Sequence, residues 1–259
     1  MLLRIESEQL AIQPDIIFSI GSLGITNAMI MGLLVTLILS VITYWITKSL
    51  SLNPSKKQNI AELIIEGFLG FIEQLTGSRS QAAFLLPLIG TLFLFLGLSN
   101  IIGLIPGLTA ITIDGIPLFR TPTNDFNMTF SIATAMVLLA QYASMKKFGF
   151  FGHMSKFFKF AHVIRSFKKG FSEGFISIID FLIGLLDIIS EFAKVISLSL
   201  RLFGNMYAGE VLAAVLMGVL AIIIPAPWTA MNFVVGILQA MVFGSLTAAY
   251  YSLSVADEE

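Results

Sequence analysis

The chain has 259 residues, of which 56% are hydrophobic and only 12% are charged, and its mean hydropathy is +0.91. A soluble domain carries about twice that charged fraction, so the composition indicates a membrane protein. There is no cysteine, which excludes disulfides and thiolate sites. Both histidines, His153 and His162, lie in one basic segment, which argues against a metal site. The net charge of −1 decides little, because in a membrane chain the positions of the charges matter more.

The chain begins with a segment, residues 1–23, that we expect to form a tail outside the membrane. Acidic residues precede its first apolar run, so it does not read as a cleaved signal peptide. A spanning helix needs about 20 mostly apolar residues to cross roughly 30 Å of hydrocarbon. Four stretches meet this requirement directly: 24–46, 83–108, 126–145 and 229–253.

An amphipathic helix is expected at 59–77, between the first two spans. Glu62, Glu66 and Glu73 share one of its faces, while Ile, Leu and Phe fill the other. This pattern is typical of a helix that lies in the membrane interface rather than across it. The alternative is a loop helix packed on the rest of the protein.

The longest apolar tract, 173–224, would measure roughly 80 Å as one helix, so it is either two spans or one strongly tilted helix. Lysines and arginines gather after the first span and in the loop 146–171, whereas the loop 109–125 has only Arg120. The positive-inside rule then places both basic clusters in the cytoplasm and the N-terminus outside. This favours a single tilted crossing, with Pro225 to Trp228 outside and the C-terminus cytoplasmic. A two-span alternative would move the last loop and the tail across the membrane.

The expected fold class is therefore an all-α polytopic membrane protein. It would have about five transmembrane helices and one interfacial amphipathic helix in a single domain, 1–259. Its last two spans would form a hairpin.

One polar stripe runs along the long tract. At roughly 100° per residue, six polar residues fall within an arc of about 80°, and a charged side chain in hydrocarbon almost always faces a cavity, a partner or the bundle interior. Toward the expected cytoplasmic end, Asp187, Glu191 and Lys194 stand at i, i+4 and i+7, so their opposite charges can offset one another. The members of the stripe are Asp180, Asp187, Glu191, Lys194, Arg201 and Asn205.

Arg201 is the charged member of the stripe without a local partner, because no acidic residue stands three or four positions from it. Arginine stays protonated under ordinary conditions, so this position is a fixed positive charge that needs an anion from elsewhere. The alternative is a buried ion pair with another helix of the same chain. The spans before 126 and after 228 contain no acidic residue at mid-depth.

Several polar residues lie off the stripe. Glu210 could bind and release protons, or it could be a hydrogen-bonded structural carboxyl. Asn232 and Gln239 stand seven apart on the last span, where amides commonly join helices through hydrogen bonds. Further polar groups on the expected outer side are Asn100, Asp125 and Asn127, and for Asp125 the alternative role is a helix cap.

The stretch SLSLRLFGNMYAGE, from Ser197 to Glu210, closely resembles the signature of subunit a of the F-type ATP synthases in its bacterial form. Supporting stretches are AELIIEGFLGFIEQL, SNIIGLIPG, NDFNMT and GILQAMVFGSLTAAYYSL. They follow the order of the family and extend the resemblance along nearly the whole chain.

The resemblance implies a proton-translocating stator in the bacterial plasma (inner) membrane that is not an enzyme by itself. It implies two offset half-channels beside a rotating ring of c subunits, each bearing an ion-binding carboxylate, and long tilted helices next to that ring. The other implied partners are subunit b of the peripheral stalk, the remainder of the F1F0 complex and the lipid bilayer. No nucleic acid, cofactor or metal is implied.

The resemblance also assigns roles to single residues. Arg201 matches the arginine that attracts each ring carboxylate and separates the half-channels. Glu210, Asn205 and Gln239 match residues of the ion path. The expected outward-facing candidates are Asp125, Asn127, Asn100 and Asn232, and Asn232 departs from relatives with a titratable histidine at this position.

A competing interpretation is a secondary transporter with an anion site at Arg201 near the midplane. No internal repeat is visible, although such transporters commonly have one. An intramembrane hydrolase is a weaker alternative, because neither H-E-x-x-H nor G-x-S-x-G is present.

Overall fold

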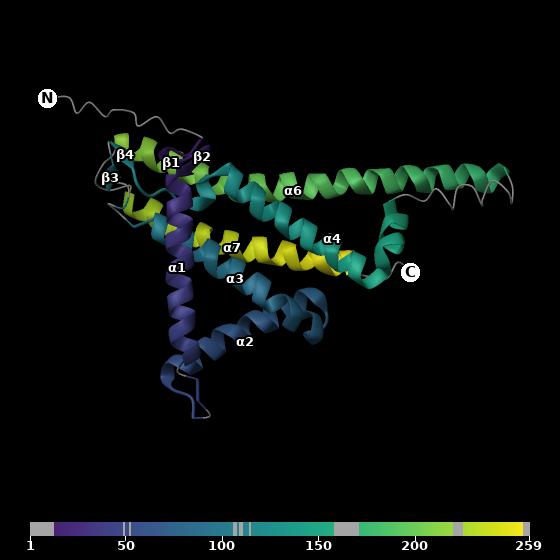
Figure 1. The fold of residues 1–259 in the computed structure, drawn as a ribbon, viewed down its shortest axis with the longest axis horizontal. Helices are drawn as coiled ribbons and strands as arrows, with labels where there is room; N and C mark the ends of the chain where they lie inside the picture. Colours follow the sequence, from purple (N-terminus) through teal and green to yellow (C-terminus); the bar gives the residue numbers. More distant parts are fainter. Residues whose placement is uncertain are drawn as a thin grey trace. The chain divides into compact units, whose positions relative to one another are not determined.

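The computed structural model describes residues 13–48, 50–51, 53–105, 108, 111–113, 115–157, 171–219 and 225–255. Within these ranges, several side chains near 155–180, 213–219 and 225–226 are not described. The described part contains six α-helices and two short β-hairpins (Figure 1). The predicted fold class, an all-helical membrane protein, is confirmed. Four of the helices are long and apolar enough to cross a membrane by length and composition.

A β-hairpin stands immediately before the first helix, within and just beyond the segment expected to be a plain tail. Strand β1, Ile16–Ile20, pairs with β2, Leu23–Thr26, in antiparallel register. Between them Gly21 adopts a φ of 65°, which glycine reaches without a Cβ clash. The sequence analysis missed this hairpin, because its apolar residues look like the approach to the first span.

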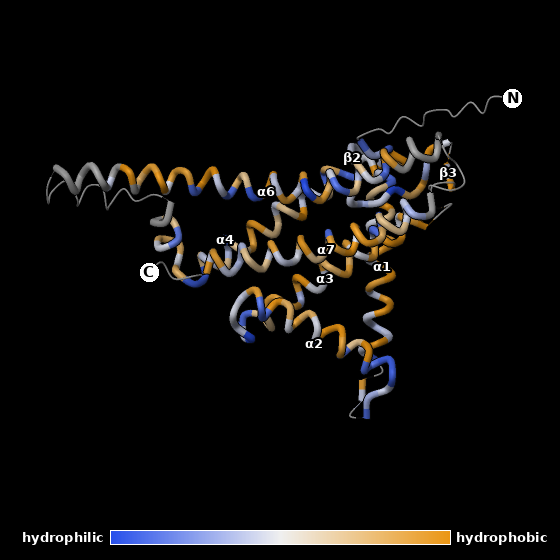
Figure 2. The backbone as a smooth tube through the Cα atoms, turned by 180° about the vertical axis from the view of Figure 1, so that it is seen from behind, coloured by the Kyte–Doolittle hydropathy of each residue, from blue (hydrophilic) through white to orange (hydrophobic). Residues whose placement is uncertain are grey.

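Helix α1, Asn27–Lys48, follows the hairpin directly. The Thr26 hydroxyl accepts a hydrogen bond from the backbone N–H of Met29, at 3.3 Å, which satisfies one of the free donors at the helix start. Figure 2 shows apolar residues along α1 and polar ones in the segment between α1 and α2.

Helix α2, Lys56–Thr76, corresponds to the expected amphipathic helix. Ser55 caps its start by accepting from the N–H of Gln58, and Gly77 ends it with a φ of 69°. The helix packs on α3, where the rings of Phe68 and Phe93 meet edge to face at 4.5 Å. Large apolar side chains of α2 nevertheless stay exposed, namely Ile60, Leu63, Ile64, Ile65 and Leu75. The helix thus packs on α3 and also leaves apolar side chains uncovered, and its place in the membrane interface stays a prediction.

Helix α3, Arg79–Gly103, buries a regular stripe of Leu85, Ile89, Leu92 and Leu96. The spacing of three and four residues puts these side chains on one face, as core burial requires. Helix α3 ends five residues before the expected limit of its span at 108. A short hairpin, β3 (Thr112–Ile113) with β4 (Ile116–Pro117), and a 3-10 turn, η2 (Pro122–Asn124), follow it.

Three long helices complete the described chain: α4 (Phe126–Phe157), α6 (Phe171–Val219) and α7 (Pro225–Val255). Helix α4 extends beyond the span expected at 126–145 and is interrupted at Gly149, whose φ of 75° and ψ of 162° are not helical. It therefore occupies part of the expected loop 146–171, of which 158–170 lie outside the described residues. The 49 residues of α6 amount to about 73 Å of helix axis.

The chain divides into two compact units, each described by itself below. The first contains Met1–Thr129 and Leu200–Ala248, and the second contains Phe130–Ser199 and Ala249–Glu259. Arg201 and the amide and carboxyl groups near it belong to the first unit.

Candidate functional site

Arg201 lies on α6 with an exposed side chain, whereas the neighbouring Leu202 is fully buried. Successive residues of a helix point about 100° apart, so the helix buries its leucine face here and presents the arginine on another. Among the residues that the structure describes, none forms an ion pair or hydrogen bond with the Arg201 guanidinium. The charge that the sequence left without a local partner therefore has no partner elsewhere in the described chain either.

One turn further along α6, Asn205 joins this helix to α7. Its Nδ2 donates a hydrogen bond to Oε1 of Gln239, at 2.7 Å. Gln239 is only 5% exposed, and its Nε2 has no partner among the described residues. Residues four apart share a helix face, so the guanidinium and the amide pair lie on the same side of α6.

Glu210 is held by a different segment. Its carboxylate accepts a hydrogen bond from Nδ2 of Asn124, the last residue of η2. Nine residues separate Arg201 from Glu210, which on a regular helix means opposite faces and about 13.5 Å along the axis. The two opposite charges of the first unit's α6 segment are thus kept apart rather than paired.

Asn100 ties together the three segments around Glu210 and Gln239. Its Oδ1 accepts from the Thr123 hydroxyl at 2.7 Å, and its Nδ2 donates to the carbonyl of Gly236 at 3.2 Å. Asn100 and Thr123 are each 1% exposed, so both hydrogen bonds are shielded from solvent. Through them α3 fixes η2, which carries Asn124, and α7, which carries Gln239.

Helices α6 and α7 approach closely near Gly209. Trp228 Nε1 donates a hydrogen bond to the Gly209 carbonyl at 3.2 Å. A Cβ added at Gly209 would lie 3.0 Å from Oδ1 of Asn232, so a side chain there would displace Asn232. Within this unit, the contacts of residues 205 and 209 with 239 and 228 show that the two helices run antiparallel as a hairpin.

Asp125 and Asn127 stand at the start of α4. Oδ1 of Asp125 accepts from the Asn127 backbone N–H at 2.9 Å, and Asp125 is 5% exposed. A short acidic side chain that accepts from the second helical N–H is a helix cap. The side chain of Asn127 is exposed. The capping role weighed for Asp125 is therefore the one that this geometry supports.

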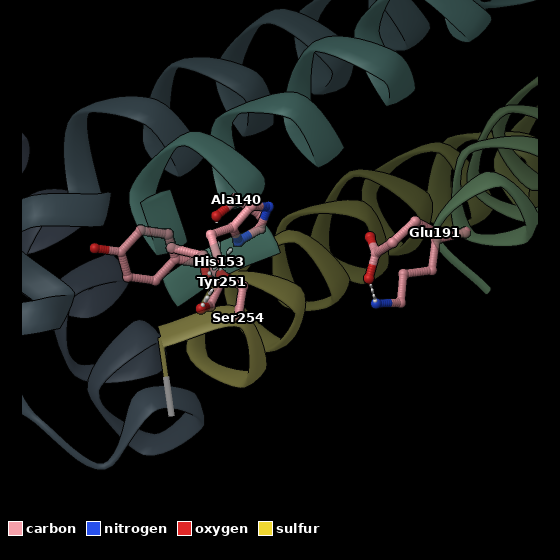
Figure 3. Close-up of polar contacts among 7 residues, drawn as sticks. Ala140, His153, Glu191, Tyr251 and Ser254 are labelled. Carbon is pink, nitrogen blue, oxygen red and sulfur yellow. Dashed lines mark hydrogen bonds and ion pairs between the residues drawn. The ribbon is translucent and has the colours of Figure 1, made fainter. Parts of the chain in front are cut away.

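The remaining stripe residues belong to the second unit. The side chain of one of them, Asp180, is not described. Lys194 Nζ contacts Oε1 of Glu191 at 2.5 Å (Figure 3), and it lies 5.3 Å from the centre of the Tyr250 ring. Asp187 is exposed. The expected offsetting of charges thus takes the form of one ion pair between residues three apart.

The second unit also joins the end of α7 to α4. The Ser254 hydroxyl donates to the carbonyl of Ala140 at 3.0 Å (Figure 3), and Lys147 Nζ donates to the carbonyl of Val255 at 2.8 Å. His153, 4% exposed, lies 3.0 Å from the Ser144 hydroxyl through its Nδ1. These contacts involve none of the residues near Arg201.

Within the described ranges, no cluster of three or more His, Asp or Glu side chains could hold a metal ion. The described polar groups are suited instead to hydrogen bonding and to exchanging protons at a carboxylate. Asn124 and Thr123 were not predicted as contributors, although they stand directly before Asp125 in the sequence. The sequence did contain a signal for Asn124, because it is an amide residue immediately before the helix-capping Asp125.

Comparison with known proteins gives consistent matches. The sequence model of the family described as ATP synthase A chain matches residues 29–252. ATP synthase subunit a of Desulforamulus reducens is 33% identical over 250 residues, covering 88% of this chain and 83% of the relative. The corresponding protein of Enterococcus hirae is 32% identical over 259 residues, covering 95% and 99%, and that of Moorella thermoacetica is 28% identical over 239, covering 92% and 95%.

Proposed function

The chain belongs to the ATP synthase A chain family, and on that premise we propose that Arg201 separates two half-channels through which protons reach a ring of partner subunits. A member of this family is a proton-channel subunit of the membrane sector and is not itself catalytic. The proposal concerns how its residues divide that task.

The unpartnered guanidinium of Arg201 is the observation that carries the proposal. An exposed arginine without an anion among the described residues is available to a carboxylate that arrives on another polypeptide. At 4 Å and an effective dielectric constant of about 20, such a pair attracts by about 4 kcal/mol. Each passing ring carboxylate would lose its proton before it meets Arg201 and regain one after leaving it, so protons could not cross without rotation of the ring.

The amide pair on the same face would keep Arg201 in place. Asn205 is held by Gln239 at 2.7 Å, and neither amide titrates, so the guanidinium would be the only fixed charge on this face of the first unit's α6. The arginine can then engage a ring carboxylate without competition from an acid of its own helix.

Glu210 would exchange protons in the half-channel that opens to the outside. It lies about 13.5 Å along α6 from Arg201 and on the opposite face, which suits a station on the path rather than a counter-ion. Asn232 lies close to Gly209, the residue that precedes Glu210 on α6. Because an amide cannot titrate, Glu210 would act without a second acid or base at that position. Asn100, Asp125 and Asn127 would line or support the outer entrance.

The proposed orientation follows the basic residues. The basic segments after the first span and at 146–171 would lie in the cytoplasm of a bacterium, with the N-terminus outside and the C-terminus inside. We also propose that residues 1–259 form a single membrane domain, as hydropathy predicts. The proposed partners are the c-ring, subunit b of the peripheral stalk and the remainder of the complex.

Replacement of Arg201 by alanine tests the proposal. We expect Arg201→Ala to abolish ATP-driven proton pumping in inverted membrane vesicles, measured by quenching of a pH-sensitive dye, with normal amounts of assembled complex. Arg79→Ala is the matched control, because Arg79 is an exposed arginine of α3 paired only with Glu73, at 3.1 Å, among the described residues. Pumping that persists in Arg201→Ala and collapses with a protonophore would refute the assigned role.

A further inference from the structure

We propose that Asn124 is a positioning residue that holds the Glu210 carboxylate in one orientation for proton exchange. The inference rests on the proposed function of Glu210 and adds a residue from a segment that the ion path did not include. It makes Asn124, which stands directly before Asp125, a partner of Glu210.

The contact joins groups that are 86 residues apart. Asn124 is 4% exposed, so its Nδ2 donates to the carboxylate in a largely dry environment. Hydrogen bonds to charged acceptors are stronger and more directional than those between neutral groups. Asn124 therefore restricts where the Glu210 oxygens lie.

The structure around Asn124 keeps its amide aimed at Glu210. The Asn124 backbone N–H donates to the Thr121 carbonyl at 2.9 Å, which closes the turn of η2. The preceding residue, Thr123, is anchored to Asn100 at 2.7 Å. A side chain on a turn fixed at two points has little freedom to leave its partner, as a positioning residue requires.

The second atom of the Asn124 amide supports a role in proton exchange rather than in packing alone. Its Oδ1 is buried and has no hydrogen-bond partner among the described residues. Buried acceptors of this kind are normally satisfied by ordered water. A water bound to Oδ1 would lie next to the carboxylate that Nδ2 holds, where it could carry a proton to or from Glu210.

Three substitutions of Asn124 separate the donor from the shape of the side chain. Asn124→Leu and Asn124→Asp keep the size but remove the donor, and the aspartate adds a second negative charge. Asn124→Gln keeps the donor but is one methylene longer. The readout is the initial rate of ATP-driven proton pumping per assembled complex, with Asn59→Leu on exposed α2 as the matched control.

A positioning role predicts that both Leu and Asp slow pumping about tenfold or more and that Gln retains the larger part of the rate. In a Glu210→Gln background, Asn124→Leu should change the rate less than twofold, because the carboxylate it orients is gone. A role in packing alone predicts the opposite order, with the longer Gln worst, and effects that multiply with Glu210→Gln. Either of these results would overturn the inference.

The outcomes also distinguish this inference from the proposed function. If Glu210→Gln slows pumping strongly but the Asn124 series follows side-chain size, only the inference fails. If Glu210→Gln pumps at the wild-type rate, both the station at Glu210 and its positioning by Asn124 are refuted. If Asn124→Leu does not assemble, the comparison of Asp with Gln decides between donor and shape.

Discussion

Replacement of Asn100 by leucine should destabilise the first unit by about 1–3 kcal/mol, because Asn100 is the hydrogen-bond acceptor of a buried hydroxyl. The change leaves the Thr123 hydroxyl and the Gly236 carbonyl without the partners they have at 2.7 and 3.2 Å. Each buried polar group without a partner costs about 1–3 kcal/mol. The Gly236 carbonyl lies inside α7 and keeps its helical hydrogen bond, so only the Thr123 hydroxyl is left unsatisfied and the expected loss is about 1–3 kcal/mol of unfolding free energy.

A second substitution isolates one of the two hydrogen bonds. In Asn100→Leu/Thr123→Val the hydroxyl is gone, and the Gly236 carbonyl keeps its hydrogen bond within α7, so neither group is left without a partner. Removing both partners of a buried hydrogen bond is far less costly than removing one. The double variant should therefore recover about 1–3 kcal/mol relative to Asn100→Leu, an increase in stability caused by a further loss of a polar group.

The assay is thermal unfolding of the purified subunit in detergent, followed by near-UV circular dichroism at constant pH, with Thr123→Val alone as the third corner of the cycle. Asn59→Leu, at an exposed position of α2, controls for replacing an amide with leucine. A double variant that unfolds at or below the temperature of Asn100→Leu would refute the reasoning, because it would show that Thr123 does not depend on Asn100.

Two further predictions concern the packing of single residues. Gly236→Ala should lower the free energy of unfolding by about 1–3 kcal/mol through overpacking, because the new Cβ would lie 3.0 Å from the Asn100 Cβ. In the same thermal assay Gly90→Ala should be neutral or stabilising, because a Cβ there would meet no atom within 4 Å. Equal effects of the two substitutions would contradict this prediction. Lys194→Met should cost about 1–2 kcal/mol, between the values typical of exposed and buried ion pairs, because both partners of the 2.5 Å pair with Glu191 are only about a quarter exposed (25% and 23%). Adding Glu191→Gln should restore part of that loss, and no restoration would show that the pair contributes nothing.

Hydropathy and length located the helices well, because both are local properties of the chain. The expected amphipathic segment, 59–77, and helix α2, Lys56–Thr76, differ by only a few residues. The ends were harder to predict. Helix α4 continues past residue 145 with polar residues that a hydropathy window excludes, and its interruption at Gly149 depends on one backbone angle.

The polar contacts of the site show a similar division. Helical periodicity separated Glu210 from the face of Arg201 and Asn205, and in the structure these residues contact different segments. Periodicity could not identify Asn124 as a partner of Glu210, because that contact depends on how η2 is anchored by Asn100. The hairpin β1–β2 was missed for a comparable reason, since an apolar strand and an apolar helix start have similar compositions.

The bonds between the end of α7 and α4 also affect the order in which the protein can be made. Ser254 and Val255 contact Ala140 and Lys147, which precede them by 114 and 108 residues. At about 5–20 residues per second, the ribosome needs roughly 5–20 s to synthesise the chain between them. Throughout this interval the polar groups of α4 that these contacts use must wait for the last helical turn. The second unit is therefore completed only after residue 255 has been synthesised, and a chain truncated before Ser254 would leave α4 without these contacts.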